Sequence, residues 1–326
     1  MNTIVVSHPL YSPGMALLKS NDVQVIIPNN GNSDDILADL QKADGFILRI
    51  GKIDRKAIEA CPNLKVITRP GVGVDNVDVK AATEHGIPVV VCPAANTKSV
   101  AEHTMAMLFA VAKNLIESVH ETKKGNFNIR NKYSAIEISG KTLVILGFGN
   151  IGHEVAKIAS AIGMKIVVFD PYVTEGDVKN LGYTYTDSLL AAVPEGDFIS
   201  LHMPSSPTTK GMIDETIFLA MKPNAYFINC ARGDIVDEKA LYQALKNRQI
   251  AGAAVDVMTS EPMDQNSPLL KLSNFIATPH MAGQTQEATT KIVSLAVEGT
   301  LAVLRGEHWP HVCNPEVYET PKWKEM

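Results

Sequence analysis

The segment Thr142-Leu-Val-Ile-Leu-Gly-Phe-Gly-Asn-Ile-Gly152 contains the strongest structural signal in this chain. Its first five residues predict a buried strand, because a short apolar run that ends at a glycine is typical of one. The three glycines that follow are spaced as G-x-G-x-x-G. Apolar residues then recur at helical spacing to residue 162, and a second apolar run ends at Asp170, eighteen residues after Gly152. This order of strand, turn, helix and strand predicts a dinucleotide-binding βαβ unit.

Each glycine has a physical role in such a unit. Gly147 allows the tight turn, Gly149 lets the backbone approach a pyrophosphate, and Gly152 lets the helix pack closely on the sheet. The helix N-terminus, at Asn150 and Ile151, offers backbone N–H groups and a positive dipole to the phosphates. The alternative, a glycine-rich turn without a ligand, is disfavoured by the strands and helix around it.

Asp170 stands where the fingerprint requires an acid. We expect its carboxylate to accept hydrogen bonds from the adenosine ribose hydroxyls and to repel a 2′-phosphate. No Arg or Lys follows in residues 171–173. The sequence therefore predicts NAD, rather than NADP, as the cofactor.

The rest of the chain also alternates short apolar runs with helical patterns. Such alternation predicts parallel sheets covered by helices on both faces. We therefore expect an α/β protein with two doubly wound, Rossmann-like units. The expected strands are 4–7, 23–27, 45–49, 66–68 and 88–91 in the first unit, and 142–146, 165–169, 197–201, 225–229, 252–255 and 274–277 in the second.

The longest helical pattern covers about residues 99–124. Ser99 and Glu102 predict a capping box at its start, and Lys123-Lys124 before Gly125 predicts its end. Its first half is apolar nearly all round, which predicts burial on every side. Either a domain or subunit contact or an ordinary core helix would explain this.

Composition excludes several classes of protein. The 326 residues are 45% hydrophobic and 20% charged, which is globular, and the net charge of −5 without a long basic run argues against nucleic acid as a partner. The most apolar stretch, 105–112, is far shorter than the roughly 20 residues of a membrane span. The N-terminus lacks a secretory pattern, and no carboxylate/histidine cluster has metal-ligand spacing. Four cysteines without a C-x-x-C pair are typical of reduced thiols, so we expect a cytoplasmic protein without a metal.

Three polar groups follow predicted strands in the second half. Arg232 lies in 229–234, Glu261 follows a strand that ends before Asp256, and His280 lies in 278–283. Each alone fits a solvated turn, a loop or a structural histidine. Ligands of open α/β sheets bind at the carboxyl ends of strands. Together with the fingerprint, these groups therefore predict a dehydrogenase, with a cation for a carboxylate, a proton donor and a group that tunes it.

These motifs resemble the NAD-dependent D-isomer-specific 2-hydroxyacid dehydrogenases over nearly the whole chain. The resemblance implies hydride transfer between NAD(H) and C2 of a small D-2-hydroxy acid or 2-keto acid. It rests on Arg69-Pro-Gly-Val-Gly-Val-Asp-Asn76, Asn96-Thr-Lys-Ser-Val-Ala-Glu-His-Thr104, the glycine motif, Asn229-Cys-Ala-Arg-Gly-Asp-Ile-Val-Asp237 and Thr278-Pro-His-Met-Ala-Gly283.

The family's roles are implied for the matching positions. Arg232 would bind the substrate carboxylate, and His280 would act as general acid in reduction and base in oxidation. Glu261 would pair with His280 and favour its charged form. The backbone N–H groups of Val72 and Gly73 would bind the other carboxylate oxygen. The cofactor would contact His280, the glycine motif and Asp170, and also Thr97, His202, Pro204, Cys230, Ala231, Asp256 and Gly283.

The resemblance also implies the domain organisation. Residues 1–98 with 285–326 would form a discontinuous substrate-binding domain. Residues 99–284 would form an NAD-binding domain inserted between two hinge helices, with the active site in the cleft. A homodimer around the cofactor domain is implied as well.

Arg49 and Arg69 end predicted strands of the first unit, and an arginine pair suits a dianionic group. Phosphoglycerate dehydrogenases of the family carry arginines at these positions, while residues 281–285 resemble the hydroxypyruvate reductase type as much, so the resemblance implies a substrate of the 3-phosphoglycerate or of the hydroxypyruvate/glycerate type. Another anionic acid such as sulfolactate, and arginines held in salt bridges, remain alternatives. An NAD(H)-responsive binding protein of the corepressor kind is the alternative from a different class.

Overall fold

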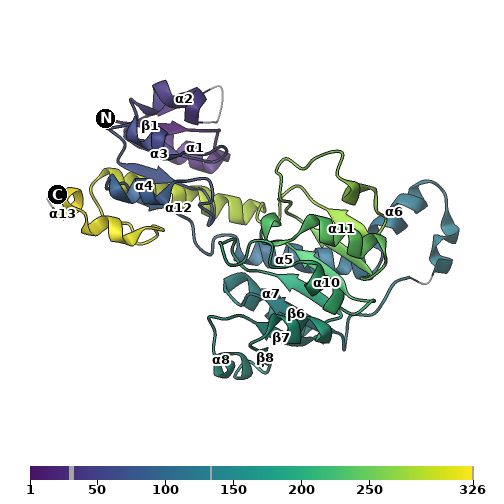
Figure 1. Ribbon diagram of the computed structural model, residues 1–326. Helices are drawn as coiled ribbons and strands as arrows, with labels where there is room; N and C mark the ends of the chain where they lie inside the picture. The colour runs from purple at the N-terminus through teal and green to yellow at the C-terminus, as the bar shows by residue number, and fades with distance from the viewer. Residues whose placement is uncertain (29–32, 133, 325–326) are drawn as a thin grey trace. The chain divides into compact units, whose positions relative to one another are not determined.

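The computed structural model describes residues 1–28, 33–132 and 134–324, and the chain divides into two compact units (Figure 1). Unit 1 contains residues 1–96 and 284–326, and unit 2 contains residues 97–283. The chain therefore leaves unit 1 once, forms all of unit 2, and returns to unit 1 at its C-terminal end.

Unit 1 is built on a parallel sheet with the strand order β2-β1-β3-β4-β5. The order reverses between β1 and β3, so the ends of these two strands form the switch point at which α/β sheets bind ligands. The strands are β1 (Asn2–Val6), β2 (Val23–Ile26), β3 (Gly45–Ile47), β4 (Val66–Thr68) and β5 (Val89–Val90).

The long helix α12 (Gln286–Leu304), from the C-terminal part of the chain, is part of the core of unit 1. Its Val297 and Leu301 pack with Ile4 of β1, and its Thr300 hydroxyl lies 2.7 Å from the Thr68 hydroxyl of β4. The other helices of the unit are α1 (Ser12–Lys19), α2 (Ser33–Leu40), α3 (Arg55–Glu59), α4 (Val79–Glu84), α13 (Pro321–Lys324) and the 3₁₀ helix η5 (Pro315–Glu319).

Unit 2 contains a larger parallel sheet with the order β12-β11-β10-β9-β6-β7-β8. The order reverses between β6 and β9, which makes the carboxyl ends of these strands its switch point. The strands are β6 (Thr142–Leu146), β7 (Lys165–Phe169), β8 (Thr184–Thr186), β9 (Phe198–Leu201), β10 (Tyr226–Asn229), β11 (Gly252–Val255) and β12 (Phe275–Ala277).

Apolar clusters cover both faces of this sheet, and helices lie outside them. Alternate residues of β6 show the division: Val144 and Leu146 belong to one cluster, and Leu143 and Ile145 to the other. The helices are α5 (Thr97–Ala112), α6 (Leu115–Lys123), α7 (Asn150–Ala161), α8 (Glu175–Lys179), α9 (Leu189–Ala192), α10 (Glu215–Ala220), α11 (Glu238–Lys246), and the 3₁₀ helices η1 (Phe127–Lys132), η2 (Val193–Glu195), η3 (Gly233–Ile235) and η4 (Pro268–Lys271).

The prediction of two doubly wound α/β units is confirmed, with one strand that the sequence pattern does not indicate. This strand is β8, at the edge of the sheet of unit 2. Its three residues, Thr-Tyr-Thr, are exposed or half-buried, so they leave no apolar run in the sequence.

The prediction of a single helix over about 99–124 is wrong. Asn114 lies between α5 and α6 with φ of 50°, a left-handed conformation that asparagine tolerates better than most residues. The capping box predicted at Ser99 and Glu102 is also wrong, because α5 begins at Thr97 and both residues lie inside it. The predicted end is confirmed, since α6 ends at Lys123 and Gly125 has φ of 81°.

The apolar character of α5 is explained by packing inside unit 2. Val100, Met105 and Leu108 are buried in one cluster with Ile145 of β6 and Val155 of α7. Of the two explanations left open by the sequence, the core helix accounts for these residues.

Candidate active site

In the glycine-rich turn after β6, each glycine is favoured over larger residues for a different steric reason. Gly147 has φ of 99°, and a Cβ there would lie 2.8 Å from the backbone carbon of His202. A Cβ at Gly152 would lie 2.2 Å from the Gly147 carbonyl oxygen, so the helix and turn could not approach as they do. A Cβ at Gly149 would meet nothing within 4 Å in the described chain. The space beside Gly149 is therefore open, as a cradle for a pyrophosphate requires.

Helix α7 begins directly after Gly149, with Asn150 as its first residue and Ile151 as its second. Gly149 is the N-cap, and no side-chain hydrogen bond caps the helix within the described residues. The described side chains therefore leave the N–H groups of the first turn uncapped. Such a helix N-terminus favours an anion.

Asp170 follows β7 and is 9% exposed. One carboxylate oxygen accepts the Phe148 N–H at 2.6 Å, and the other accepts the Tyr172 N–H at 2.7 Å. Each carboxylate oxygen can accept more than one hydrogen bond. The side chain is thus held beside the glycine turn while it retains capacity for two hydroxyl donors, as a ribose would present.

His202 follows β9, across the switch point from the glycine turn. Burial lowers the pKa of its imidazole to about 4, so the ring is neutral near pH 7. Its Nε2 lies 2.8 Å from the Ser200 hydroxyl. Pro204, two residues later, is exposed. His202 and Pro204 can therefore line a cofactor site with uncharged groups, and neither adds a positive charge.

The turn after β10 carries Cys230, Ala231 and Arg232. Asn229, 1% exposed, clamps this turn: its Oδ1 accepts the Ala231 N–H at 2.9 Å, and its Nδ2 donates to the Arg232 carbonyl at 3.0 Å. A Cβ at Gly233 would lie 2.0 Å from the backbone of Met258, so the turn packs tightly on the segment after β11.

Cys230 and Arg232 differ in what they can contribute. Burial raises the pKa of the Cys230 thiol to about 12, so it is neutral and no nucleophile. The Arg232 guanidinium donates to the Ala231 carbonyl at 2.7 Å and acts electrostatically on His280. Arg232 therefore brings a fixed positive charge close to the histidine.

Asp256, directly after β11, is 1% exposed and orders the segment that contains His280. Its backbone carbonyl accepts the His280 N–H at 2.8 Å. Its carboxylate accepts the N–H groups of Met281 at 3.0 Å and Ala282 at 2.8 Å, and the Thr278 hydroxyl at 2.5 Å. The carboxylate thus holds the turn on the C-terminal side of the histidine.

His280 and Glu261 form a hydrogen-bonded pair. The imidazole Nδ1 lies 2.6 Å from Glu261 Oε2, and this hydrogen bond raises the pKa of His280 above its ordinary value. The nearby Arg232 charge acts in the opposite direction. About half of each side chain is exposed. A histidine so arranged can give and take a proton through Nε2.

Two residues that hold the turns of the candidate site by hydrogen bonds, Asn229 and His103, were not predicted from the sequence. Asn229 stands in the quoted 229–237 motif, and an asparagine that ends a strand before a turn is a known signal for a side-chain-stabilised turn. His103, on α5, lies 3.1 Å from the Thr278 hydroxyl, through Nε2. No local signal marks His103, because its partner is 175 residues away.

Two further expected cofactor residues stand at the limits of unit 2. Thr97 is the first residue of α5, and Gly283 is the last residue of the unit. Both are half-buried. Their roles remain predictions.

The residues expected in unit 1 lie at the carboxyl edge of its sheet. Arg49 is exposed, donates to the Pro9 carbonyl at 2.8 Å, and makes no ion pair with any described residue. Arg69 donates to the carbonyl oxygens of Leu48, Arg49 and Gly73, at 2.6, 3.0 and 3.1 Å. Arg69 thus braces the 69–73 turn, on which Val72 is 53% exposed.

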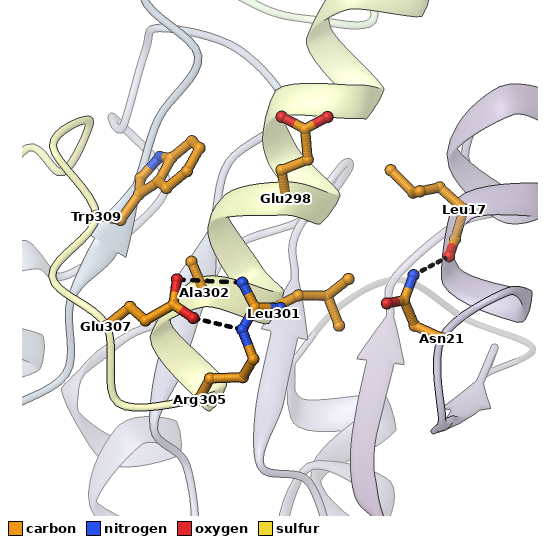
Figure 2. A pocket seen from close by; sticks show the side chains of 8 residues that line it. All are labelled: Leu17, Asn21, Glu298, Leu301, Ala302, Arg305, Glu307 and Trp309. Carbon is orange, nitrogen blue, oxygen red and sulfur yellow. Dashed lines mark hydrogen bonds and ion pairs between the residues drawn. The ribbon is translucent and has the colours of Figure 1, made fainter.

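A separate hollow of about 320 Å³ lies in unit 1 between α1 and α12 (Figure 2). Figure 2 shows the Arg305 guanidinium paired with both oxygens of Glu307, at 2.6 and 3.1 Å. Asn21 is bonded to the Leu17 carbonyl at 2.8 Å beside it. None of the residues predicted for catalysis or binding lines this hollow.

The described residues indicate neither a metal site nor a membrane-spanning helix. They contain no group of three histidine, cysteine or carboxylate side chains that could hold a metal ion. In the same part of the chain, no helix combines the length and apolar character required to cross a bilayer.

The fold and the site define a class: an α/β protein whose second unit is a dinucleotide-binding sheet that carries an arginine and a carboxylate–histidine pair. Residues 105–282 match the family model described as D-isomer specific 2-hydroxyacid dehydrogenase, NAD binding domain. The chain belongs to this family. The family resemblance and the nicotinamide dinucleotide cofactor predicted from the sequence are thereby confirmed.

Curated relatives carry a narrower description. The chain is 41% identical to D-3-phosphoglycerate dehydrogenase of Methanocaldococcus jannaschii over 96% of its own length and 60% of the relative's. It is 36% identical to the enzyme of the same name from Archaeoglobus fulgidus, over 93% of this chain and 57% of that one. The chain thus spans less than two thirds of the length of these relatives.

Solved structures match the chain over nearly their whole length. The TT0316 protein of Thermus thermophilus is 31% identical, with a TM-score of 0.85 over 95% of this chain and 99% of that one. An NADPH-dependent glyoxylate/hydroxypyruvate reductase of Sinorhizobium meliloti, solved with NADP and malonate, is 26% identical, with a TM-score of 0.86 over 96% and 97%.

Proposed function

We propose that this protein is an NAD-dependent oxidoreductase that transfers a hydride between NAD(H) and C2 of a small D-2-hydroxy acid or 2-keto acid. The observation that carries the proposal is the 2.6 Å pair of His280 and Glu261, with the Arg232 charge acting on the same imidazole. This combination supplies a proton donor and a carboxylate-binding cation in the unit that contains the dinucleotide turn.

The cofactor would be held by groups of unit 2 that match its pyrophosphate and its ribose. The space beside Gly149 and the first turn of α7 would take the pyrophosphate, and Asp170 would take the adenosine ribose hydroxyls. His202, neutral and half-buried, would line the same binding site. When bound, NADH supplies the hydride for C2.

The chain's own residues would manage charge and proton. Arg232 would bind the substrate carboxylate and polarise the C2 carbonyl. Because Nδ1 of His280 is bonded to Glu261, Nε2 is the atom that would donate a proton to the C2 oxygen in reduction and accept it in oxidation. Glu261 would stabilise the imidazolium that forms when the alcohol is oxidised.

For the substrate, we propose the 3-phosphoglycerate and phosphohydroxypyruvate pair. The names of the curated relatives support it, and so does Arg49, an exposed cation without an ion pair among the described residues. The salt-bridge alternative for Arg49 finds no support there. Val72 and Gly73 would add backbone N–H groups for the substrate carboxylate.

The first experiment is NADH oxidation by the purified protein with hydroxypyruvate, glyoxylate, pyruvate, 2-oxoglutarate, phosphohydroxypyruvate and sulfopyruvate. We expect the highest kcat/KM for phosphohydroxypyruvate. Preference for hydroxypyruvate or glyoxylate would contradict the substrate and keep the reaction class. NADH binding without turnover on any acid would contradict the reaction and favour an NAD(H)-responsive binding protein.

Two variants test the assignment of the acid and the cation. His280→Ala should lower kcat by about 10²–10⁴-fold while NADH still binds, as measured by nicotinamide fluorescence. Arg232→Lys keeps the charge and loses the two-pronged geometry, so it should retain more activity than Arg232→Ala but less than the unchanged protein. Unchanged kcat in His280→Ala would exclude it as the acid.

We also propose a homodimer formed through unit 2. Five large apolar side chains of α5, α6 and η1 are 37–68% exposed, and a second copy would cover them. They are Phe109, Leu115, Ile116, Val119 and Phe127. Sedimentation should give a dimer, and Ile116→Glu should give a monomer.

We propose a cytoplasmic location because all four cysteines are free thiols.

A further inference from the structure

His103 has no part in the reaction proposed above, yet its side chain ends in the network that orders His280. It lies on α5, and its side chain is 19% exposed. Its Nε2 is 3.1 Å from the Thr278 hydroxyl oxygen and 3.6 Å from Asp256 Oδ1. The contact joins the first helix of unit 2 to the segment after its last strand, β12.

The direction of this hydrogen-bonded chain follows from counting protons. Thr278 has one hydroxyl proton and donates it to Asp256 Oδ1, which can only accept. At the Thr278 oxygen, His103 Nε2 must therefore be the donor. The chain runs from His103 Nε2–H to the Thr278 hydroxyl and on to the Asp256 carboxylate. Hydrogen bonds in such a chain strengthen one another.

The last member of this hydrogen-bonded chain, Asp256, orders a strained backbone segment. His280 has φ of 51°, a conformation that L-residues adopt only when their surroundings impose it. Asp256 imposes it from both sides, with its carbonyl on the His280 N–H and its carboxylate on the N–H groups of Met281 and Ala282. A carboxylate that rotates would release the last two groups together.

We propose that His103 is a positioning residue for the reaction: through Thr278 it fixes the rotation of the Asp256 carboxylate, and thereby the left-handed turn that presents the His280 imidazole. The proposal rests on the proposed function for its effect on turnover. Its structural part, that His103 secures the 280–282 turn, stands on the contacts alone.

The variants at position 103 differ in whether the new side chain can reach Thr278 with a hydrogen-bond donor. His103→Gln places an amide nitrogen where Nε2 was, so the new side chain can donate to Thr278. His103→Asn places its amide at the position of Nδ1, short of Thr278, and His103→Leu has no donor. Thr278→Val removes the middle link with almost no change of shape. His120→Leu, an exposed histidine of α6 outside the network, is the control.

We expect His103→Leu, His103→Asn and Thr278→Val each to lower kcat for keto-acid reduction about tenfold, because a small misplacement of a reacting group is costly. KM for the keto acid should change less than about twofold. His103→Gln should retain at least about a third of the original kcat, since it keeps the donor. The double variant His103→Leu/Thr278→Val should be no worse than either single one, because both break the same chain.

Hydrogen–deuterium exchange supplies a readout that needs no activity. Amides in peptides covering 278–283 should lose protection in His103→Leu and His103→Asn, and keep it in His103→Gln and in the control. If His103→Leu unfolds and loses protection throughout unit 2, Thr278→Val takes its place in both measurements.

Three results would overturn the proposal: kcat of His103→Leu within about twofold of the original, equal damage in His103→Gln and His103→Leu, or unchanged exchange of 278–283 in His103→Leu. If the unchanged protein reduces no keto acid, the proposed function fails. In that case the exchange data alone decide whether His103 secures the turn.

Discussion

The carboxylate of Glu261 accepts a 2.6 Å hydrogen bond from Nδ1 of His280, nineteen residues further along the chain. The contact occupies Nδ1 and leaves Nε2 as the ring nitrogen proposed to exchange a proton with a substrate, and it is the main cause of the raised pKa of His280. A neighbouring arginine acts against it, so the imidazole is held between an anion that favours its charge and a cation that opposes it.

Glu261→Gln should move the pH dependence of both directions of the reaction to lower pH. Gln keeps a hydrogen bond and loses the negative charge, so the pKa of His280 falls. Reduction requires the imidazolium and is lost as pH rises through that pKa, so the loss begins at lower pH in the variant. Oxidation requires the neutral ring, so its rise also begins at lower pH.

The measurement is kcat/KM against pH for reduction and for oxidation. Above the variant's midpoint, reduction should be about tenfold slower than in the unchanged protein. Profiles that coincide in both directions would show that Glu261 does not set the charge of His280.

Asp170→Asn should raise the use of NADP relative to NAD. Asn retains an acceptor for a backbone N–H and removes the charge that repels a 2′-phosphate. The ratio of kcat/KM for NADH over NADPH should fall about tenfold or more, in keeping with hydrogen bonds to a charged group. Asp170→Ala should relax the ratio similarly and also lower Tm, because it leaves two backbone N–H groups without their acceptor. An unchanged ratio in both variants would show that Asp170 does not read the ribose.

Gly149→Ala and Gly152→Ala should separate binding from stability. A Cβ at Gly149 meets no described atom within 4 Å, so Tm should stay within about 2 °C while Kd for NADH rises at least about tenfold. A Cβ at Gly152 lies 2.2 Å from the Gly147 carbonyl oxygen. That clash should destabilise the protein by roughly 1–3 kcal/mol, visible as a lower Tm. Normal NADH affinity in Gly149→Ala would contradict the pyrophosphate cradle.

Arg49→Ala and Arg69→Ala should differ in kind. Arg49 is exposed and has one backbone contact, so its loss should raise KM for phosphohydroxypyruvate about tenfold and leave that for hydroxypyruvate within about threefold. Arg69 donates hydrogen bonds to three backbone carbonyls, so its loss should lower the free energy of unfolding by roughly 1–3 kcal/mol, visible as a lower Tm. It should also lower kcat/KM for both substrates. Equal effects on both substrates in Arg49→Ala would exclude a phosphate contact.

The class of fold could be predicted from the sequence because its signals are local. The apolar run into Gly147, the helical spacing after it and Asp170 lie within thirty residues, and each reports backbone geometry or burial at its own position. The same local information fails where tertiary packing decides. The break at Asn114 lies within an otherwise helical pattern, and the exposed edge strand β8 has no apolar run.

The residue types of the candidate site were also readable from the sequence, but how they are held was not. Arg232 and His280 each lie three residues after a strand, and Glu261 lies six residues after β11, beyond the carboxyl ends where ligands are expected. Their supports come from far along the chain: Asp256 reaches Ala282 across 26 residues, and His103 reaches Thr278 across 175. Local sequence patterns are sufficient to predict the sheets, the glycine turn and the groups proposed to react. The hydrogen bonds that hold these groups depend on tertiary packing, because a hydrogen bond requires two atoms within about 3 Å, and sequence spacing does not determine that distance between separate elements.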